Sequence, residues 1–311
     1  MGTPDFAVAS LQAILDNGYT VAGVITAPDR EAGRGKKVRF SAVKEYALKQ
    51  NLKILQPVKL KDGDFLSELA SLKADLQVVV AFRMLPEAVW SMPRLGTFNL
   101  HASLLPQYRG AAPINHALIN GEKVTGVTTF FLDKEIDTGR IIDRVEVPIR
   151  KDDDFGTLHD RLMQAGAKLV ADTIEKIRTG NVKPVDQTKL VAPGEVLHPA
   201  PKIFKEFCRI NWHQKGERVY NFIRGLSPYP GAYTYFNIED NGQLMVKIFK
   251  TAFEEAAHNN EPGSVLREGD RLKTAVDDGY IYIKELQAPG KKRMFAGDFL
   301  RGFHQNILSA G

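Results

Sequence analysis

The sequence of 311 residues contains a single cysteine, Cys208. One thiol excludes an internal disulfide framework and a zinc site built from several cysteines, so we expect a protein of the reducing cytoplasm. No apolar run approaches the roughly 20 residues that a membrane-spanning helix requires, and we expect no membrane partner. The sequence also lacks internal repeats, low-complexity segments and a P-loop, and Gly33-Arg-Gly35 does not complete a dinucleotide-binding fingerprint.

Patterns typical of metal sites and of nucleophilic catalysis are missing as well. His101 and His116 are too far apart for an i, i+4 ligand pair and share no acidic partner in their segment, so we expect no metal site. Three aspartates at 152–154 precede a predicted helix, where negative charge is favourable without a metal. Ser103 could be proposed as a nucleophile, but no glycine elbow surrounds it.

The composition that remains is typical of a folded globular protein, with 43% hydrophobic residues, 25% charged residues and a net charge of +5. Helices and strands alternate in the first half, which predicts an α/β, doubly wound Rossmann-like domain. The predicted helices cover 6–15, 41–49, 64–72 and 157–178, with others from 86 and 114, and the predicted strands cover 19–26, 53–55, 76–82, 97–100, 126–132 and 140–148.

The composition changes at 180–202, where four prolines in a polar stretch indicate a linker. A short helix at 216–224 follows, and then short strands that turn signals separate. These strands are predicted at 232–238, 244–253, 263–266, 272–276 and 280–286. They predict a small β-barrel, of which an OB-like barrel is one form. We therefore expect a first domain at 1–180, a linker at 181–203 and a β-barrel domain at 204–311.

The most informative stretch is Asn99-Leu-His-Ala-Ser-Leu-Leu-Pro106. Asn99 and His101 share one face of a strand end by the two-residue period, and open α/β sheets bind ligands at the carboxyl ends of their strands. We expect Asp137, in the loop 133–139, to fold back over this end, where a carboxylate favours imidazolium and fixes the tautomer of a histidine. Asparagine, histidine and aspartate supply an oxyanion donor and a proton relay but no nucleophile, so transfer should be direct between two bound substrates.

Plainer interpretations of these residues stay open. A lone Asn-x-His is common in a turn with a surface histidine, and Asp and Gly suit a hairpin loop for conformational reasons alone. The sequence around 133–139 is compatible with both interpretations.

Residues 27–39 form a predicted loop without periodicity that carries five cations against two anions. The loop follows the carboxyl end of a strand, and phosphate contacts by such cations position a nucleic acid and make its binding salt-dependent. A solvated loop without a partner is the alternative. The residues that we expect to contact a nucleic acid, here and at a predicted hairpin tip near the end of the chain, are Arg34, Lys36, Lys37, Arg39, Lys291, Lys292 and Arg293.

The stretch Asn99–Ile114, with Asp137-Thr-Gly139 downstream, resembles the formyltransferases that use 10-formyltetrahydrofolate. Three further stretches are similar to the methionyl-tRNA formyltransferases among them, namely Met1–Phe6, Pro28–Lys37 and Arg224–Ala232. The similarity extends over essentially the whole chain. The resemblance also implies a β-strand just before Met1–Phe6, central in the sheet.

The resemblance implies that Asn99, His101 and Asp137 are catalytic, with initiator methionyl-tRNA and the folate co-substrate as the partners of a monomer. The α-amine of methionine would attack the formyl carbon, Asn99 and His101 would stabilise the tetrahedral oxyanion, and Asp137 would tune His101 and relay protons through water. The folate would lie against the segment after the 78–82 strand, the floor at 103–106 and the Asp137 loop. The implied folate residues are Phe82, Met84, Leu85, Ser103, Leu104, Leu105, Pro106, Asp133, Thr138 and Gly139.

Two other functions stay open from the sequence. One is a folate-dependent formyltransferase that acts on a small amine, such as a sugar nucleotide or glycinamide ribonucleotide. The cationic loop argues against it, because a small acceptor has no use for such a loop. The other is a non-catalytic RNA-binding protein, against which the presence of Asn99, His101 and Asp137 argues.

Overall fold

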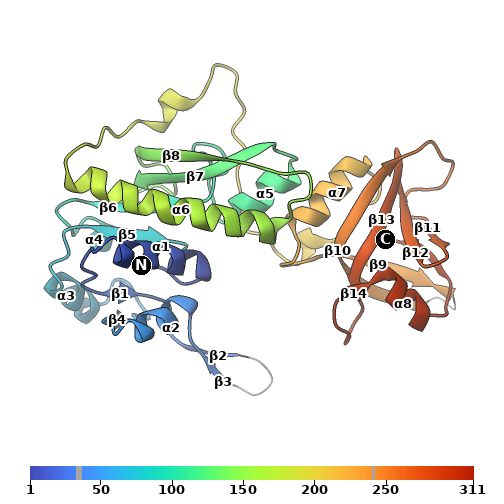
Figure 1. Cartoon of the computed structure of the whole chain (residues 1–311), viewed down its shortest axis with the longest axis horizontal. Coiled ribbons are helices and arrows are strands. Elements are labelled where there is room, and N and C mark those ends of the chain that lie inside the picture. The colour runs from blue at the N-terminus through green and yellow to red at the C-terminus, as the bar shows by residue number, and fades with distance from the viewer. Residues whose placement is uncertain (33–36, 240–241) are drawn as a thin grey trace. The chain divides into compact units, whose positions relative to one another are not determined.

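The computed structural model describes residues 1–32, 37–239 and 242–311 (Figure 1). The chain divides into two compact units, the first formed by 1–110, 125–148 and 160–199 and the second by 111–124, 149–159 and 200–311. Among the described residues no helix combines the length and the apolar character needed to cross a membrane. The second unit thus includes two segments, 111–124 and 149–159, that were expected in the first domain. The domain boundaries expected at 180 and 203 stay a prediction.

The first unit is an α/β domain with a mixed sheet. Its helices are α1 (Asp5–Asp16), α2 (Ala42–Lys49), α3 (Gly63–Ser71), α4 (Glu87–Trp90) and most of α6 (Phe155–Arg178). The sheet has the order β5 (Gln77–Val80), β6 (Thr97–His101), β7 (Val124–Phe131) and β8 (Ile141–Pro148). β5 and β6 are parallel, whereas β6 and β7 are antiparallel. The predicted α/β class is confirmed.

Helix α6 covers one face of this sheet. The hydroxyls of Thr173 in α6 and Thr129 in β7 are 2.9 Å apart. Gly166 lies so close to β6 that an added Cβ would be 2.7 Å from the Leu100 side chain. Because side chains alternate along a strand, Leu100 faces α6, whereas Asn99 and His101 project from the other face.

Two elements of the first unit differ from the sequence prediction. The strand predicted at 19–26 is only β1 (Val24–Ile25), which pairs in parallel with β4 (Ile54–Leu55). The predicted loop at 27–39 contains an antiparallel hairpin, β2 (Arg30–Ala32) with β3 (Lys37–Arg39). Both predictions were wrong because pairing with a neighbouring strand, which no local pattern reports, decides where a strand begins and ends.

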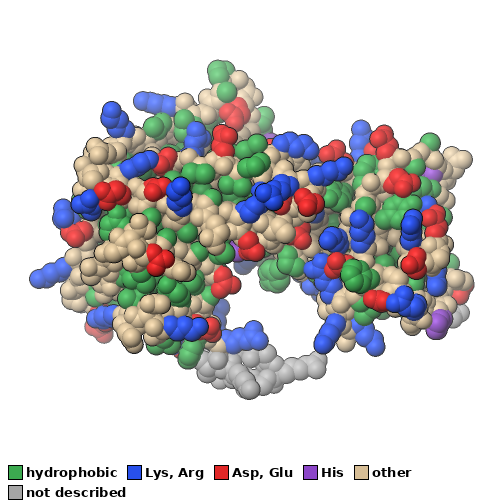
Figure 2. All heavy atoms as spheres, in the orientation of Figure 1, with side chains coloured by type: hydrophobic (Ala, Val, Ile, Leu, Met, Phe, Trp, Pro, Cys, Tyr) green, Lys and Arg blue, Asp and Glu red, His purple; other side chains and the backbone are tan. Residues whose placement is uncertain are grey.

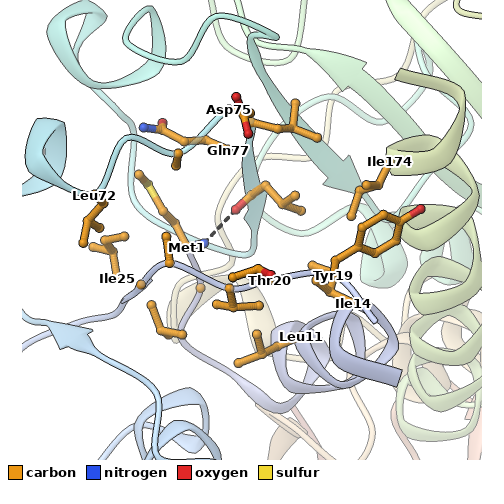
Figure 3. Close-up of a pocket in the computed structure, with 18 of the residues that line it drawn as sticks. Met1, Leu11, Ile14, Tyr19, Thr20, Ile25, Leu72, Asp75, Gln77 and Ile174 are labelled. Atoms are coloured by element: carbon orange, nitrogen blue, oxygen red, sulfur yellow. Dashed lines mark hydrogen bonds between the residues drawn. The ribbon is translucent and has the colours of Figure 1, made fainter. Parts of the chain in front are cut away.

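The segment at Met1 lies between β5 and β1. The Met1 amine donates to the Val78 carbonyl at 2.6 Å, and the Gly2 amide donates to the Ile25 carbonyl at 3.0 Å. Burial lowers the pKa of the Met1 amine to about 5. A cavity of about 590 Å³ lies beside this segment, with Leu11 and Ile14 of α1 on one side and Gln77 on another (Figure 3). The strand that the family resemblance implies before Met1 stays a prediction.

The second unit is a nearly closed antiparallel β-barrel accompanied by helices. The helices are α5 (Pro113–Ile119), α7 (Gly216–Gly225) and α8 (Ala296–Gly302). The strand order is β11 (Val265–Glu268), β12 (Arg271–Val276), β13 (Gly279–Gln287), β10 (Gly242–Glu255), β9 (Ala232–Ile238) and β15 (Ile307–Ala310), and β14 (Met294–Phe295) pairs with β13. A bridge between Ser264 and Ser309 brings the two ends of this order together. The predicted barrel is confirmed.

The core of the second unit explains part of the Arg224–Ala232 motif. Arg224 is buried at 8% exposure and donates to the carbonyls of Arg150 and Asp153 and to the side chain of Asn221. Burial lowers the pKa of this guanidinium. Because a buried cation is tolerated only with such partners, Arg224 has a structural role in holding the turn at 150–153.

Candidate active site

His101 is held at the carboxyl end of β6 by a backbone carbonyl. The side chain is 6% exposed, and its Nε2 is 2.8 Å from the carbonyl oxygen of Tyr108. A carbonyl only accepts hydrogen bonds, so Nε2 carries a proton, and in the neutral form of the ring the lone pair is at Nδ1. Nδ1 is 3.8 Å from Oδ2 of Asp137, which is too long for a direct hydrogen bond. The tautomer is therefore set by Tyr108, whereas the sequence had indicated Asp137.

Asp137 is fixed in an unusual backbone conformation beside His101. Its φ of 57° lies in the left-handed region, which aspartate tolerates better than most residues. Its Oδ2 accepts from the Gly110 amide at 3.0 Å, and its carbonyl accepts from the Gln187 side chain at 2.8 Å. The structure thus brings His101 and Asp137 together across 36 residues of chain, as the sequence predicted.

Asn99 lies two residues before His101 on the same face of β6, partly buried and opposite Phe130 of β7. Within the described parts of the chain its side-chain amide has no hydrogen-bond partner. A free amide at this position can donate to an oxygen of a bound substrate. The three predicted side chains therefore supply a free N–H donor, a lone pair and a carboxylate on one side of the sheet.

The segment 103–107, directly after β6, is held by hydrogen bonds from buried groups. Thr128 donates to the Ser103 carbonyl at 2.7 Å and accepts from the Leu105 amide at 3.2 Å. Ser103 is fully buried, and its hydroxyl donates to the Gln107 carbonyl at 2.6 Å. This hydroxyl therefore closes a turn, which argues against the alternative of Ser103 as a nucleophile.

The residues predicted to bind folate differ in how deeply their side chains are buried. Leu105 is fully buried against Phe130 and Ile141, and Leu85 is buried in another apolar cluster, whereas Met84 is 70% exposed. The others in that set are Phe82, which is half-buried, Leu104 and Pro106 in the floor, and Asp133 and Thr138 in the Asp137 loop. Their contacts with a folate stay a prediction.

Gly139 has a structural reason to be glycine. A Cβ at this position would be 1.7 Å from the carbonyl oxygen of Phe131. The close approach of the two strands at this hairpin therefore excludes any side chain. Its own carbonyl accepts from the Gln187 side chain at 2.8 Å.

Four groups that hold the surroundings of His101 and Asp137 were not predicted from the sequence, namely the Tyr108 carbonyl, the Arg109 side chain, the Gly110 amide and the Gln187 side chain. The first three belong to the motif that carried the family resemblance, but the Tyr108 carbonyl and the Gly110 amide are backbone groups, which leave no signal in residue types. Gln187 lies in the segment predicted as a linker, and nothing in that polar stretch distinguishes it. Only the tertiary structure brings these groups to the site.

Asp29, directly before the cationic hairpin, is held by side chains of neighbouring segments in the first unit. Asp29 accepts from Gln56 at 2.8 Å and pairs with Lys44, and these contacts lower the pKa of its carboxyl. Arg30 and Arg39 are exposed and directly opposite each other in the β2–β3 pair. Arg34 and Lys36 lie outside the described residues, as does the side chain of Lys37.

The second predicted cationic cluster lies between β13 and β14. Arg293 is 2.5 Å from a Glu285 oxygen and its guanidinium lies over the Phe249 ring, so this side chain already has partners. Lys291 and Lys292 are exposed. On the face shown in Figure 2, Lys and Arg side chains are spread over the surface with Asp and Glu among them.

Two further observations on the described parts of the chain concern other kinds of site. No group of three or more His, Cys, Asp or Glu residues there could hold a metal ion. The cavity beside Met1 is lined mainly by α1, residues 19–25 and 72–80, and by none of the described residues predicted for catalysis or folate binding (Figure 3).

Comparison with known proteins assigns the family. The Formyl transferase family matches residues 1–174, and the Formyl transferase, C-terminal domain family matches residues 202–304. The chain is 55% identical to the methionyl-tRNA formyltransferase of Bacteroides fragilis, over 98% of this chain and 94% of that protein. It is 56% identical to the methionyl-tRNA formyltransferase of Phocaeicola vulgatus, over 97% and 94%.

Among solved structures, the fold is similar to that of WlaRD, a sugar 3N-formyl transferase crystallised in the presence of dTDP and 5-N-formyl-THF. The TM-score is 0.64 at 24% identity, and the match covers 94% of this chain and 97% of that one. This likeness bears on the fold alone. The two family matches and the identity above 50% over nearly the whole chain lead to one conclusion: the chain belongs to the methionyl-tRNA formyltransferases, a family of folate-using enzymes.

Proposed function

We propose that the chain transfers the formyl group of 10-formyltetrahydrofolate to the α-amine of methionine on initiator tRNA, with Asn99, His101 and Asp137 as its catalytic residues. The observation that carries this assignment is the pairing of His101 Nδ1 with Asp137 Oδ2 at 3.8 Å, beside a histidine whose Nε2 is already committed to Tyr108. This pairing leaves one lone pair and one carboxylate available to move protons.

The proposed reaction transfers the formyl group directly between the two substrates, through a tetrahedral intermediate and without a covalent bond to the enzyme. The uncharged amine forms a bond to the formyl carbon, and the carbonyl electron pair moves to oxygen. The free amide of Asn99 donates to that oxygen, and His101 donates from Nδ1 once it is protonated. The amine proton passes through water to the His101–Asp137 pair. Collapse of the intermediate breaks the bond to N10 of the folate, which takes up a proton.

The proposed folate site is formed by the segment 103–106 and the Asp137 loop. Backbone groups after β5 and in the loop 133–139 would hold the pterin, with the segment 103–106 beneath the reacting atoms. The fully buried Ser103 and Leu105 support a rigid floor. We propose further that the enzyme is a monomer and acts in the cytoplasm. We also propose that His101 and Asp137 move the proton without a metal ion.

We propose that the β2–β3 hairpin binds the tRNA. Arg30 and Arg39 face each other across this hairpin, and like charges directly opposite are unfavourable unless an anion lies between them. A phosphate of the acceptor stem would relieve that repulsion. The Asp29 contacts with Lys44 and Gln56 support a fixed hairpin base.

Neutralising Arg34, Lys36 and Lys37 to glutamine should raise the KM for tRNA and flatten its salt dependence. Each lost phosphate contact reduces the slope of log K against log[salt] by about one, so the triple variant should lose roughly 2–3 units of slope. The measurement is tRNA affinity from 50 to 200 mM salt. Exposed lysines at 49, 59 and 61 provide a matched triple control. An unchanged slope would show that these three side chains do not contact phosphates.

The acceptor is tested by formyl transfer from 10-formyltetrahydrofolate to three amines in parallel. They are charged initiator tRNA, a nucleotide-linked amino sugar and glycinamide ribonucleotide. We expect turnover with the tRNA only. A folded preparation that binds folate and formylates only a small amine would refute the proposed acceptor.

A further inference from the structure

A glutamine in the segment between the two predicted domains connects the two loops of the proposed site. Gln187 begins η1 (Gln187–Leu190), and its side chain is 2% exposed. Its amide nitrogen donates to the carbonyls of Asp137 and Gly139, both at 2.8 Å. Its amide oxygen accepts from Nε and Nη2 of Arg109, at 3.0 and 2.6 Å.

Gln187 uses its full hydrogen-bonding capacity in these four contacts. A primary amide has two N–H donors and an oxygen with two lone pairs, and here each has a partner. Glutamate in its place would keep the contact with Arg109 but could donate to neither carbonyl. Methionine has a similar length and would make none of these hydrogen bonds. The site therefore selects a side chain that is donor and acceptor at once.

The groups joined by Gln187 are those that hold His101 and Asp137. Arg109 lies between Tyr108, whose carbonyl accepts from His101, and Gly110, whose amide donates to Asp137. On the other side, Gln187 binds the carbonyl of Asp137 itself. Because a left-handed φ persists only where surrounding contacts hold it, the bond to this carbonyl helps to keep Asp137 in place.

The rest of the same segment holds the loop before Arg109. The Gln107 side chain donates to Glu195 at 2.8 Å and to the Val196 carbonyl at 3.1 Å, and it accepts from the His198 amide at 2.9 Å. The Tyr108 amide donates to the His198 carbonyl at 2.7 Å. Three consecutive residues, 107–109, are thus held by hydrogen bonds to the segment 187–198. Among the residues of that segment that make these contacts, Gln187 alone is also hydrogen-bonded to the Asp137 loop.

We propose that Gln187 is a positioning residue for formyl transfer, which holds the Asp137 carboxylate opposite Nδ1 of His101 without touching either substrate. The proposal rests on the catalytic roles proposed above for His101 and Asp137. Misplacing a catalytic group by about 1 Å can reduce the rate by about 10²-fold, so loss of Gln187 should act on kcat.

The first test compares Gln187→Glu and Gln187→Met with the exposed control Thr188→Ala on the same short helix. We expect kcat to fall about 10- to 100-fold in both Gln187 variants, with both KM values within about threefold of the parent. Thr188→Ala should keep the parent kcat. Thermal unfolding identifies a variant that does not fold. If Gln187→Met does not fold, the test rests on Gln187→Glu, which keeps the contact with Arg109. A parent-like kcat in the folded Gln187 variants would overturn the proposal, as would a change confined to KM.

The second test is a double-mutant cycle with Asp137→Asn. If Gln187 acts through Asp137, adding Gln187→Glu to Asp137→Asn should reduce kcat by less than about threefold further, because residues that act as a unit are not additive. A full additional 10-fold loss would show that Gln187 acts elsewhere and would overturn the positioning role alone. Full activity of Asp137→Asn by itself would instead refute the catalytic role of Asp137, and the positioning role would fall with it.

Discussion

His101→Ala should reduce kcat by about 10³-fold or more while leaving the affinity for tRNA within about threefold. The change removes the lone pair at Nδ1 that faces Asp137 and, in the protonated state, a donor to the oxyanion. General acid–base catalysis contributes about 10²–10⁴-fold, and one oxyanion donor about 10²–10³-fold. The affinity for tRNA should persist because the proposed phosphate contacts lie on the β2–β3 hairpin.

Two measurements separate these effects. Single-turnover rates with 10-formyltetrahydrofolate and charged initiator tRNA report the chemistry, and binding of uncharged tRNA reports affinity. The control is His304→Ala, because His304 is exposed and lies far along the chain in the other unit. Since His101→Ala removes one hydrogen bond to the Tyr108 carbonyl, thermal unfolding checks that the variant is folded. A large loss of tRNA binding with the single-turnover rate retained would refute the catalytic assignment.

Asp137→Asn should reduce kcat by about 10²–10⁴-fold with little change in the fold. Asparagine tolerates the left-handed φ of 57° as aspartate does, and its side-chain oxygen can still accept from the Gly110 amide. The substitution therefore removes the negative charge that faces Nδ1 of His101 and keeps an acceptor oxygen for Gly110. Without that carboxylate, protonated His101 loses its counter-charge and the proton relay loses its acceptor.

Asp137→Ala is the matched comparison for the backbone. Alanine disfavours the left-handed conformation and cannot accept from Gly110, so this variant should lose both the charge and the ordered loop. We expect Asp137→Ala to have a lower melting temperature than Asp137→Asn and a kcat at least as low. The pH–rate profiles of the parent and Asp137→Asn provide the decisive measurement. Identical profiles and rates would exclude Asp137 from the proton relay.

The pattern of residues along the chain was sufficient to predict the part of the candidate site that lies on one strand. Asn99 and His101 share a face of β6 because side chains alternate along every strand, and Leu100 between them faces α6. The alternation of helices and strands likewise determined the α/β class, and the closely spaced short strands determined the barrel. These features depend on periodicity, which the chain carries in its own order of residues.

Pairing between distant strands could not be derived in the same way. The β-branched run at 19–26 predicts a long strand, yet only Val24 and Ile25 pair with β4. The cationic stretch at 27–39 shows no alternation, yet Arg30–Ala32 and Lys37–Arg39 form a hairpin. In both cases the backbone partner, and not the residue type, decides the strand.

The proposed catalytic pair, His101 and Asp137, shows most clearly what the sequence determines and what the tertiary structure determines. The sequence by itself supplied a histidine at a strand end and an aspartate in a turn, together with the family motif around them. Only the tertiary structure decided that the Tyr108 carbonyl sets the tautomer of His101, and that Gly110 and Gln187 hold Asp137. The physical reason is that these contacts use backbone groups and an amide about 50 residues away, and hydrogen bonds of that kind form only once the chain has folded.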